Sequence, residues 1–175
     1  MLSRSHGRML EEMGALQRGA SSILQQRALP AELAAIDTAL GFFEGSGARH
    51  EADEEQSLFP RLRDRPELWP LLSDLVADHE HHQSLLGQLR SLRNRWPVSG
   101  PDAGAGASFA MAANELVRAY RQHIDREDRD LLPVAAELLT RGERDSLTTE
   151  MERRRGRAPQ GPARKPAGAV GTRLR

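Results

Sequence analysis

The chain has 175 residues and a formal net charge of zero, and it contains no cysteine. This length predicts a single domain with a substantial core, and the lack of cysteine excludes disulfides, thiolate zinc sites and thiol catalysis. Aromatic residues make up only 4% of the chain, whereas Leu and Ala are common. This composition favours an all-α fold packed on Leu and Ala over a sheet.

The charge is unevenly distributed along the chain. Residues 153–175 carry eight Lys or Arg and no acidic residue, so the rest of the chain has more acidic than basic residues. An acidic body argues against nucleic acid as a partner. We find no run of 18 apolar residues and no basic-then-apolar segment at the N-terminus, so we expect no membrane span and a cytoplasmic protein.

Apolar residues at three- and four-residue steps predict two long helices in the first half of the chain. The first covers residues 2–28, and the second covers residues 31–63. The second is interrupted by Gly45-Ser46-Gly47, which predicts a kink or a brief loop. Pro60 is expected to close or bend its end.

The second half repeats this organisation. A third helix is expected from about Pro66 to Trp96, followed by a loop over residues 98–107. Ser108 is the expected N-cap of a fourth helix that runs to about Arg141, with a kink at Pro133. Short connections between long helices predict an up-down-up-down four-helix bundle.

The end of the chain is expected to differ from the bundle. A short fifth helix is predicted within residues 143–155, which would complete a domain over residues 1–155. Residues 156–175 are rich in Pro, Gly, Ala and Arg, which predicts a disordered basic tail.

Residues of the second helix recur 73 positions later in the fourth. His50, Glu54, Leu58 and Pro60 correspond to His123, Glu127, Leu131 and Pro133, and the same shift carries His6 onto His79. Each half therefore has a lone His and, 44 residues later, a His-x3-Glu pair. The repeat predicts two halves related by a pseudo-two-fold axis.

These recurring His and Glu residues lie on the apolar faces of the predicted helices. A buried carboxylate among Leu residues costs several kcal/mol unless it is paired or binds a metal. A His-x3-Glu pair places both side chains on one face, so Glu54 and Glu127 could bridge two ions while four His residues supply terminal nitrogens. This mixed N/O donor set suits iron or manganese better than calcium or magnesium, and ligand type alone leaves zinc open.

Each residue also has a structural interpretation. A lone His on an apolar face is more often a hydrogen-bonded core residue, and the acidic run around Glu54 could be a solvated face. The joint pattern on four helices favours the metal site. Glu51 and His82 are added as candidate ligands, with a surface Glu and a core His bonded to a neighbour as the alternatives. Tyr120 would either bond a bridging Glu or pack in the core, and His81 is expected in solvent.

The chain resembles the hemerythrin-like HHE cation-binding family. The resemblance rests on Ser5-His6, on the stretch from His50 to Pro60, on Asp78-His79 and on the stretch from His123 to Pro133, and it spans about residues 3–140. It implies a four-helix bundle with an oxo- or hydroxo-bridged di-iron centre, with manganese or a mixed Fe/Mn pair as variants. His6, His50, His79 and His123 would be terminal ligands, and Glu54 and Glu127 would be bridges.

Two residues depart from the pattern of the oxygen carriers in this family. Glu51 stands where the family has a second His, and Gln83 stands where the oxygen carriers have a His four residues after His79. A carboxylate-rich site would stabilise ferric iron and favour oxygen activation or sensing over reversible carriage.

Three functions follow from this reading. The first is a di-iron protein that binds dioxygen, nitric oxide or iron itself for sensing, storage or delivery. The second is a di-iron redox enzyme, such as an oxidase or a peroxidase. The third is a helical interaction protein whose His and Glu residues are incidental. The expected partner is dioxygen or another small diatomic or peroxide ligand, and the expected assembly is a monomer or a weak homodimer.

Overall fold

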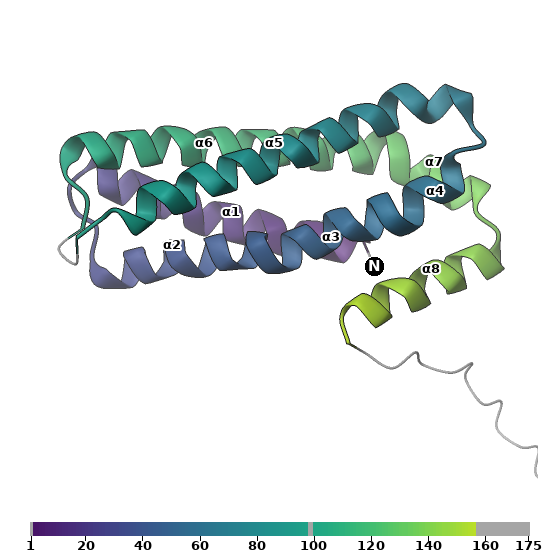
Figure 1. Cartoon of the computed structure of the whole chain (residues 1–175), viewed down its shortest axis with the longest axis horizontal. Coiled ribbons are helices and arrows are strands. Elements are labelled where there is room, and N and C mark those ends of the chain that lie inside the picture. The colour runs from purple at the N-terminus through teal and green to yellow at the C-terminus, as the bar shows by residue number, and fades with distance from the viewer. Residues whose placement is uncertain (1, 98–99, 157–175) are drawn as a thin grey trace, which may run out of the picture.

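The computed structural model describes residues 2–97 and 100–156, and all regular elements in these ranges are helical. Four long helical segments run alongside one another in an up-down-up-down bundle, which confirms the fold expected from the sequence (Figure 1). Among the described helices, none has both the length and the apolar character needed to cross a membrane.

The first segment is α1 (Leu2–Leu24). The second is continuous through α2 (Pro30–Phe42), η1 (Phe43–Gly47), α3 (Ala48–Asp53), η2 (Glu54–Leu58) and α4 (Phe59–Leu62). The third joins the short η3 (Pro66–Leu68) to α5 (Trp69–Asn94), and the fourth joins α6 (Ala103–Arg126), η4 (Glu127–Leu131) and α7 (Leu132–Leu138). A shorter helix, α8 (Arg141–Arg154), follows.

The apolar core consists of two clusters. One cluster fills the part of the bundle where α1, α2, α5 and α6 pack together, and it reaches from Met9 and Tyr120 to Trp96. The other fills the opposite part around α4, α7 and α8, and it includes Leu58, Leu131 and Met151 among others. On α5 the buried His79 and His82 lie between the Leu residues of the two clusters. A buried polar layer therefore separates two apolar regions of one bundle.

Three π turns interrupt the second and fourth segments. Two of them, η2 and η4, are related by the 73-residue repeat, and each begins at a Glu of a His-x3-Glu pair. Pro60 and Pro133 follow these turns and cannot donate a backbone hydrogen bond to the carbonyl four residues earlier, which favours a wider turn. The third, η1, contains Gly45-Ser46-Gly47, so the expected kink or loop is instead a π turn within a continuous helix.

The expected N-cap at Ser108 is wrong. The fourth segment begins at Ala103, and Asp102 caps it with Oδ1 accepting from the amide of Ala105 at 2.8 Å. Of the two glycines near the start of this helix, Gly106 is at a position where only a small residue fits. A Cβ on Gly106 would lie 2.6 Å from Cγ2 of the buried Ile23, so a Gly allows α1 and α6 to approach closely.

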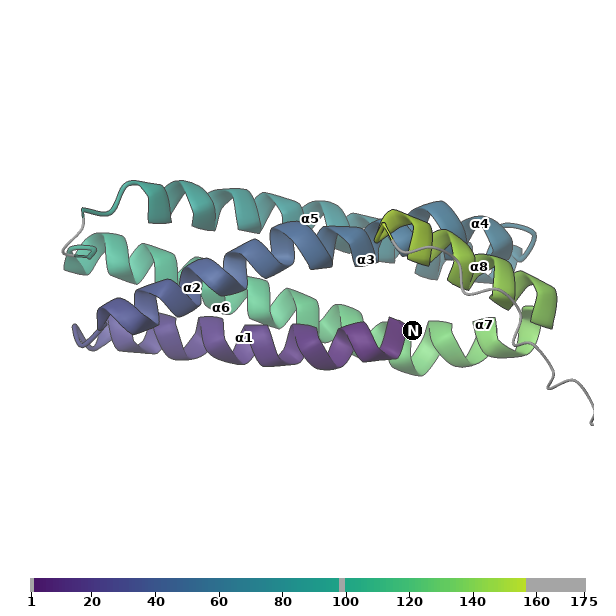
Figure 2. The same cartoon turned by 90° about the horizontal axis from the view of Figure 1, so that it is seen from below.

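The helix α8 lies across the second segment near its end (Figure 2). Its last residues pair with a carboxylate that is completely buried. Asp53 receives hydrogen bonds from Arg154, with Nη1 and Oδ1 at 2.6 Å, and from Arg155. A second link joins Arg61 to Glu150 at 2.7 Å. Arg154 and Arg155 thus fasten α8 to the bundle. The sequence predicts disorder over residues 156–175, and residues 157–175 lie outside the described residues.

Candidate metal centre

Six ligand-type side chains meet in the buried polar layer, and all four long segments contribute. His6 comes from α1, His50 and Glu54 from the second segment, His79 from α5, and His123 and Glu127 from the fourth. Each is at most 2% exposed. These are the six residues that the repeat in the sequence relates to one another.

The first group of four consists of His6, His50, Glu54 and Glu127. Nε2 of His6 lies 3.2 Å from Nε2 of His50. Nε2 of His50 lies 3.0 Å from Oε1 of Glu54, and Nε2 of His6 lies 3.0 Å from Oε2 of Glu127. The ligand atoms of the group all lie within 4.8 Å of one another, which is compatible with a single ion between them.

The second group repeats this geometry with His79, His123 and the same two carboxylates. The two Nε2 atoms are 3.3 Å apart. Nε2 of His123 lies 3.4 Å from Oε1 of Glu127, and Nε2 of His79 lies 3.3 Å from Oε2 of Glu54. Each carboxylate therefore turns one oxygen to each group, as a bridge between two ions does.

The charge of this layer supports a cation at its centre. All four oxygens of Glu54 and Glu127 are buried, and none is in hydrogen-bonding geometry with a donor among the described residues. Burial raises the pKa of Glu54 well above its usual value, and the charge of Glu127 raises it further. Burial would also raise the pKa of Glu127, but the contacts with His123, His50 and His6 lower it below its usual range. A divalent cation would stabilise both carboxylates in their charged form.

Three of the four His residues are oriented through the other ring nitrogen. Nδ1 of His6 donates to Oδ1 of Asp128 at 2.9 Å, and Nδ1 of His79 donates to Oε1 of Glu55 at 2.6 Å. These bonds fix the rings with Nε2 toward the centre and make that nitrogen a better metal ligand. The sequence analysis missed both carboxylates, although Glu55 and Asp128 are themselves related by the 73-residue shift.

The remaining pair of His residues breaks the symmetry. Nδ1 of His123 donates to Oδ2 of Asp78 at 3.2 Å. Burial lowers the pKa of His123, but Asp78 and Glu127 outweigh this effect and raise it to about 9. Nδ1 of His50 is buried and has no hydrogen-bond partner among the described residues. Ser5 occupies the position in the first half that Asp78 occupies in the second, so the equivalent carboxylate is missing from the sequence.

Glu51 and His82 lie outside the two groups of four and contact each other. Glu51 is only 4% exposed, so the surface alternative is wrong. Its Oε1 lies 3.4 Å from Nδ1 of His82, and its Oε2 accepts from Gln83 at 3.3 Å. The hydroxyl of Tyr120 donates to Oε1 of Glu51 at 3.2 Å, and its ring stacks on His82 with centroids 3.7 Å apart. Tyr120 thus both bonds and packs, and its partner is Glu51 and not a bridging Glu. His81 is exposed, as expected.

Comparison with known proteins gives one family. The model described as Hemerythrin HHE cation binding domain matches residues 1–135, which include all eight candidate ligands and the four long segments up to the middle of α7. No curated protein matches the chain at a significant level. The helix α8 lies beyond the matched residues.

Proposed function

The chain belongs to the hemerythrin HHE cation-binding domain family, and from this premise we propose that it is a non-haem di-iron protein that binds dioxygen, nitric oxide or iron itself. Sensing, storage and delivery are the roles that such binding would serve. The metal-binding part of the proposal is supported by a buried His/Glu cluster in two groups of four.

One observation carries the proposal: the two carboxylates each turn one oxygen toward each pair of Nε2 atoms. His6 and His50 would hold one ion, His79 and His123 would hold the other, and Glu54 and Glu127 would bridge them. Two nitrogens and two carboxylate oxygens per ion suit iron, and the same donors accept manganese. When bound, such a centre supplies an open coordination position at which a small ligand can bind or be activated.

Glu51 and His82 remain proposed contributors to the same centre. In His82 one ring nitrogen faces a carboxylate and the other, Nε2, is buried without a partner among the described residues. Nδ1 of His6 and Nδ1 of His79 likewise face a carboxylate, while their Nε2 atoms contact the other residues of the two groups of four. Glu51 lies close enough to Glu54 for its charge to raise the pKa of that residue. We therefore propose His82 as a further nitrogen ligand and Glu51 as a carboxylate that either orients it or binds directly.

The alternative is a redox enzyme, and the environment of Tyr120 favours it. The phenol is 1% exposed and bonds to Glu51 beside the centre. Burial and the charge of Glu51 raise the pKa of Tyr120 well above its usual value, so the hydroxyl stays protonated and acts as a hydrogen-bond donor and not as an acid. A hydrogen-bond donor at this place could stabilise a reduced form of oxygen, and this is the observation that favours an oxidase or a peroxidase.

Metal analysis and an oxygen titration test these possibilities. We expect two iron ions per chain and an absorption spectrum that changes on reduction. A reversible adduct of the ferrous protein with oxygen would support binding, whereas peroxide turnover or irreversible oxidation would support the enzyme. A protein that is purified without metal and does not take up iron would refute both and leave a helical interaction protein.

Substitution of Glu127 and His50 tests whether these two residues bind the metal. Glu127→Ala and His50→Ala should lose metal and lower the melting temperature, because the remaining buried His and Glu would have no common partner. The exposed Glu137→Ala and His81→Ala are the matched controls. If chelation and both ligand substitutions leave the melting temperature at that of the controls, the buried layer does not depend on a metal.

A further inference from the structure

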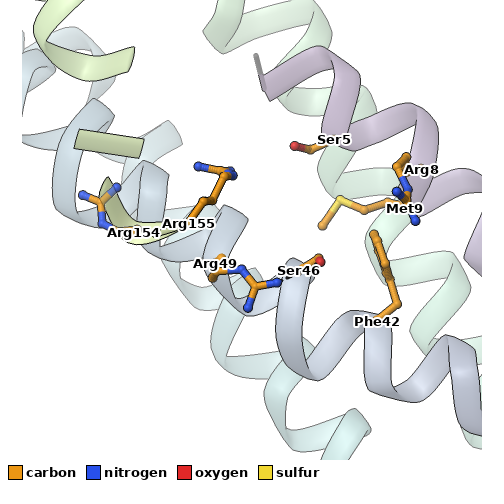
Figure 3. Close-up of a pocket in the computed structure, with 8 residues that line it drawn as sticks. All are labelled: Ser5, Arg8, Met9, Phe42, Ser46, Arg49, Arg154 and Arg155. Atoms are coloured by element: carbon orange, nitrogen blue, oxygen red, sulfur yellow. Dashed lines mark hydrogen bonds between the residues drawn. The ribbon is translucent and has the colours of Figure 1, made fainter. Parts of the chain in front are cut away.

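A pocket of about 510 Å³ lies between α1, the η1–α3 region and the end of α8 (Figure 3). Four of its lining residues are arginines: Arg8, Arg49, Arg154 and Arg155. None of the described residues that line it is acidic. From this concentration of guanidinium groups we propose that the pocket binds the phosphate group of a small ligand. The proposal goes beyond the metal centre and does not depend on its function.

The charge of the pocket is only partly balanced. Arg154 and Arg155 share the single carboxylate of Asp53, which is completely buried below them. Arg49 bonds only a hydroxyl, with Nη2 donating to Oγ of Ser46 at 3.0 Å. Arg8 lies over the ring of Phe42, with its Cζ 5.5 Å from the ring centroid. Arg8 and Arg49 have no acidic partner among the described residues, so a dianion would balance these two positive charges.

The chemistry of the lining fits a phosphate group better than a single carboxylate. Guanidinium groups match phosphate oxygens in geometry, and charge-assisted hydrogen bonds of this kind are among the strongest in proteins. The hydroxyls of Ser5 and Ser46 add neutral donors. Met9 and Phe42 supply an apolar wall, and the volume lies in the range of small-molecule pockets. The lining therefore has room for an organic group attached to the phosphate.

The repeat in the sequence points to the same pocket. The 73-residue shift relates Ser5 to Asp78 and Met9 to His82, so these two positions of α1 break the symmetry between the halves. Both line the pocket. In the second half, the carboxylate at the equivalent position bonds Nδ1 of His123. In the first half the equivalent residue is Ser5, whose short side chain leaves room for a ligand in the pocket. This position is on α1, which also carries His6 of the first group of four.

The helix α8 completes the pocket. It lies outside the residues that match the family model, and it contributes two of the four arginines. Arg154 and Arg155 therefore lie outside the matched residues, while the other lining residues lie inside them. The position of the pocket between α1 and α3 also places a bound anion against the two segments that carry His6 and His50.

Isothermal titration of the metal-loaded protein with inorganic phosphate and with AMP tests the proposal, with sodium chloride added to equal ionic strength. We expect binding of both, and we expect Arg8→Gln and Arg49→Gln to weaken it about tenfold each, because each removes a charge-assisted contact. Arg95→Gln is the matched control, since Arg95 is also exposed and also bonds a serine, with Nη2 and Oγ of Ser91 3.1 Å apart.

The outcomes separate the possible ligands. Tighter binding of AMP than of phosphate would identify a phosphate ester as the ligand, and equal binding would identify the free ion. Binding that is unchanged in Arg8→Gln and Arg49→Gln would mean that the anion binds at the metal centre or elsewhere, and it would overturn the proposal. Absence of binding at matched ionic strength, or tighter binding of succinate than of either phosphate compound, would overturn it as well.

Discussion

Two carboxylates that contact Nδ1 of the proposed His ligands offer a test of the proposed two-ion centre. Asp128 contacts Nδ1 of His6, and Glu55 contacts Nδ1 of His79. Each carboxylate orients a His of a different group of four. Asp128→Ala should therefore weaken the ion beside His6, and Glu55→Ala should weaken the ion beside His79.

The structure bounds the size of this effect. Loss of a carboxylate behind a metal-bound His typically costs 10–100-fold in metal affinity, or roughly 1.4–2.8 kcal/mol. The side chains of Asp128 and Glu55 are 49% and 39% exposed, so water can replace part of the interaction. We expect about a tenfold loss for each. The 2.6 Å contact of Glu55 is shorter than the 2.9 Å contact of Asp128, so Glu55→Ala should have the larger effect.

The assay is anaerobic competition between the protein and a chromophoric chelator for ferrous iron, fitted to two binding steps. Each variant should weaken one step and leave the other within about twofold of wild type. Asp125→Ala removes an exposed carboxylate from the segment that carries Asp128, and it is the control for the loss of one negative charge. If both variants bind both ions as the control does, Asp128 and Glu55 do not support the proposed ligands, and the assignment of one carboxylate to each ion is wrong.

Three further predictions concern stability. Asp53→Ala should lower the free energy of unfolding by about 3 kcal/mol in urea titrations, because it leaves the two arginines at the end of α8 without their buried partner; a change below that of an exposed Asp→Ala substitution would contradict this. The hydrogen bond from Arg61 lowers the pKa of Glu150 from 4.5 to about 2, so its contribution is present above pH 4.5 and lost as the pH falls to about 2. The difference in stability between wild type and Glu150→Gln should shrink over that interval, and a constant difference would refute the assignment. A Cβ on Gly19 would lie 2.5 Å from Cγ1 of the buried Ile36, so Gly19→Ala should destabilise the protein by about 1–3 kcal/mol, and a raised melting temperature would be the contrary result.

Much of this fold could be predicted because the apolar positions keep helical spacing. In α5 the buried residues Leu72, Leu75, His79, His82, Leu86 and Leu89 follow one another at three- and four-residue steps. The grouping of the six symmetric His and Glu residues could be predicted for a second reason, since a buried carboxylate needs a partner. The 73-residue repeat then showed which His and Glu residues of the first half correspond to those of the second. None of this needed knowledge of side-chain geometry.

The π turns were missed although the sequence contains their cause. His50, Glu54, Leu58 and Leu62 are all buried and stand four residues apart. Four residues of an α-helix advance about 40° beyond one full turn, so three such steps would carry the last residue off the core face. A wider turn keeps all four on one line, and the structure has η2 at this point. The N-cap Asp102 was missed for a different reason: both Asp102 and Ser108 are residue types that cap helices, and the Gly/Ala-rich stretch between them gave no sign of where the helix begins.

Two pairs of positions related by the 73-residue shift differ in polarity, and they make the surroundings of the centre asymmetric. Glu51 corresponds to Ile124 in the second half, and His82 corresponds to Met9 in the first. The two polar members of these pairs come from different halves, yet they contact each other and Tyr120 on one side of the centre. On α1 the positions equivalent to Asp78 and His82 line the arginine pocket instead. The bundle thus places a hydrogen-bond donor, Tyr120, beside one part of the symmetric His/Glu centre and an arginine-lined pocket beside another. A small ligand at the centre would therefore have different polar groups on its two sides.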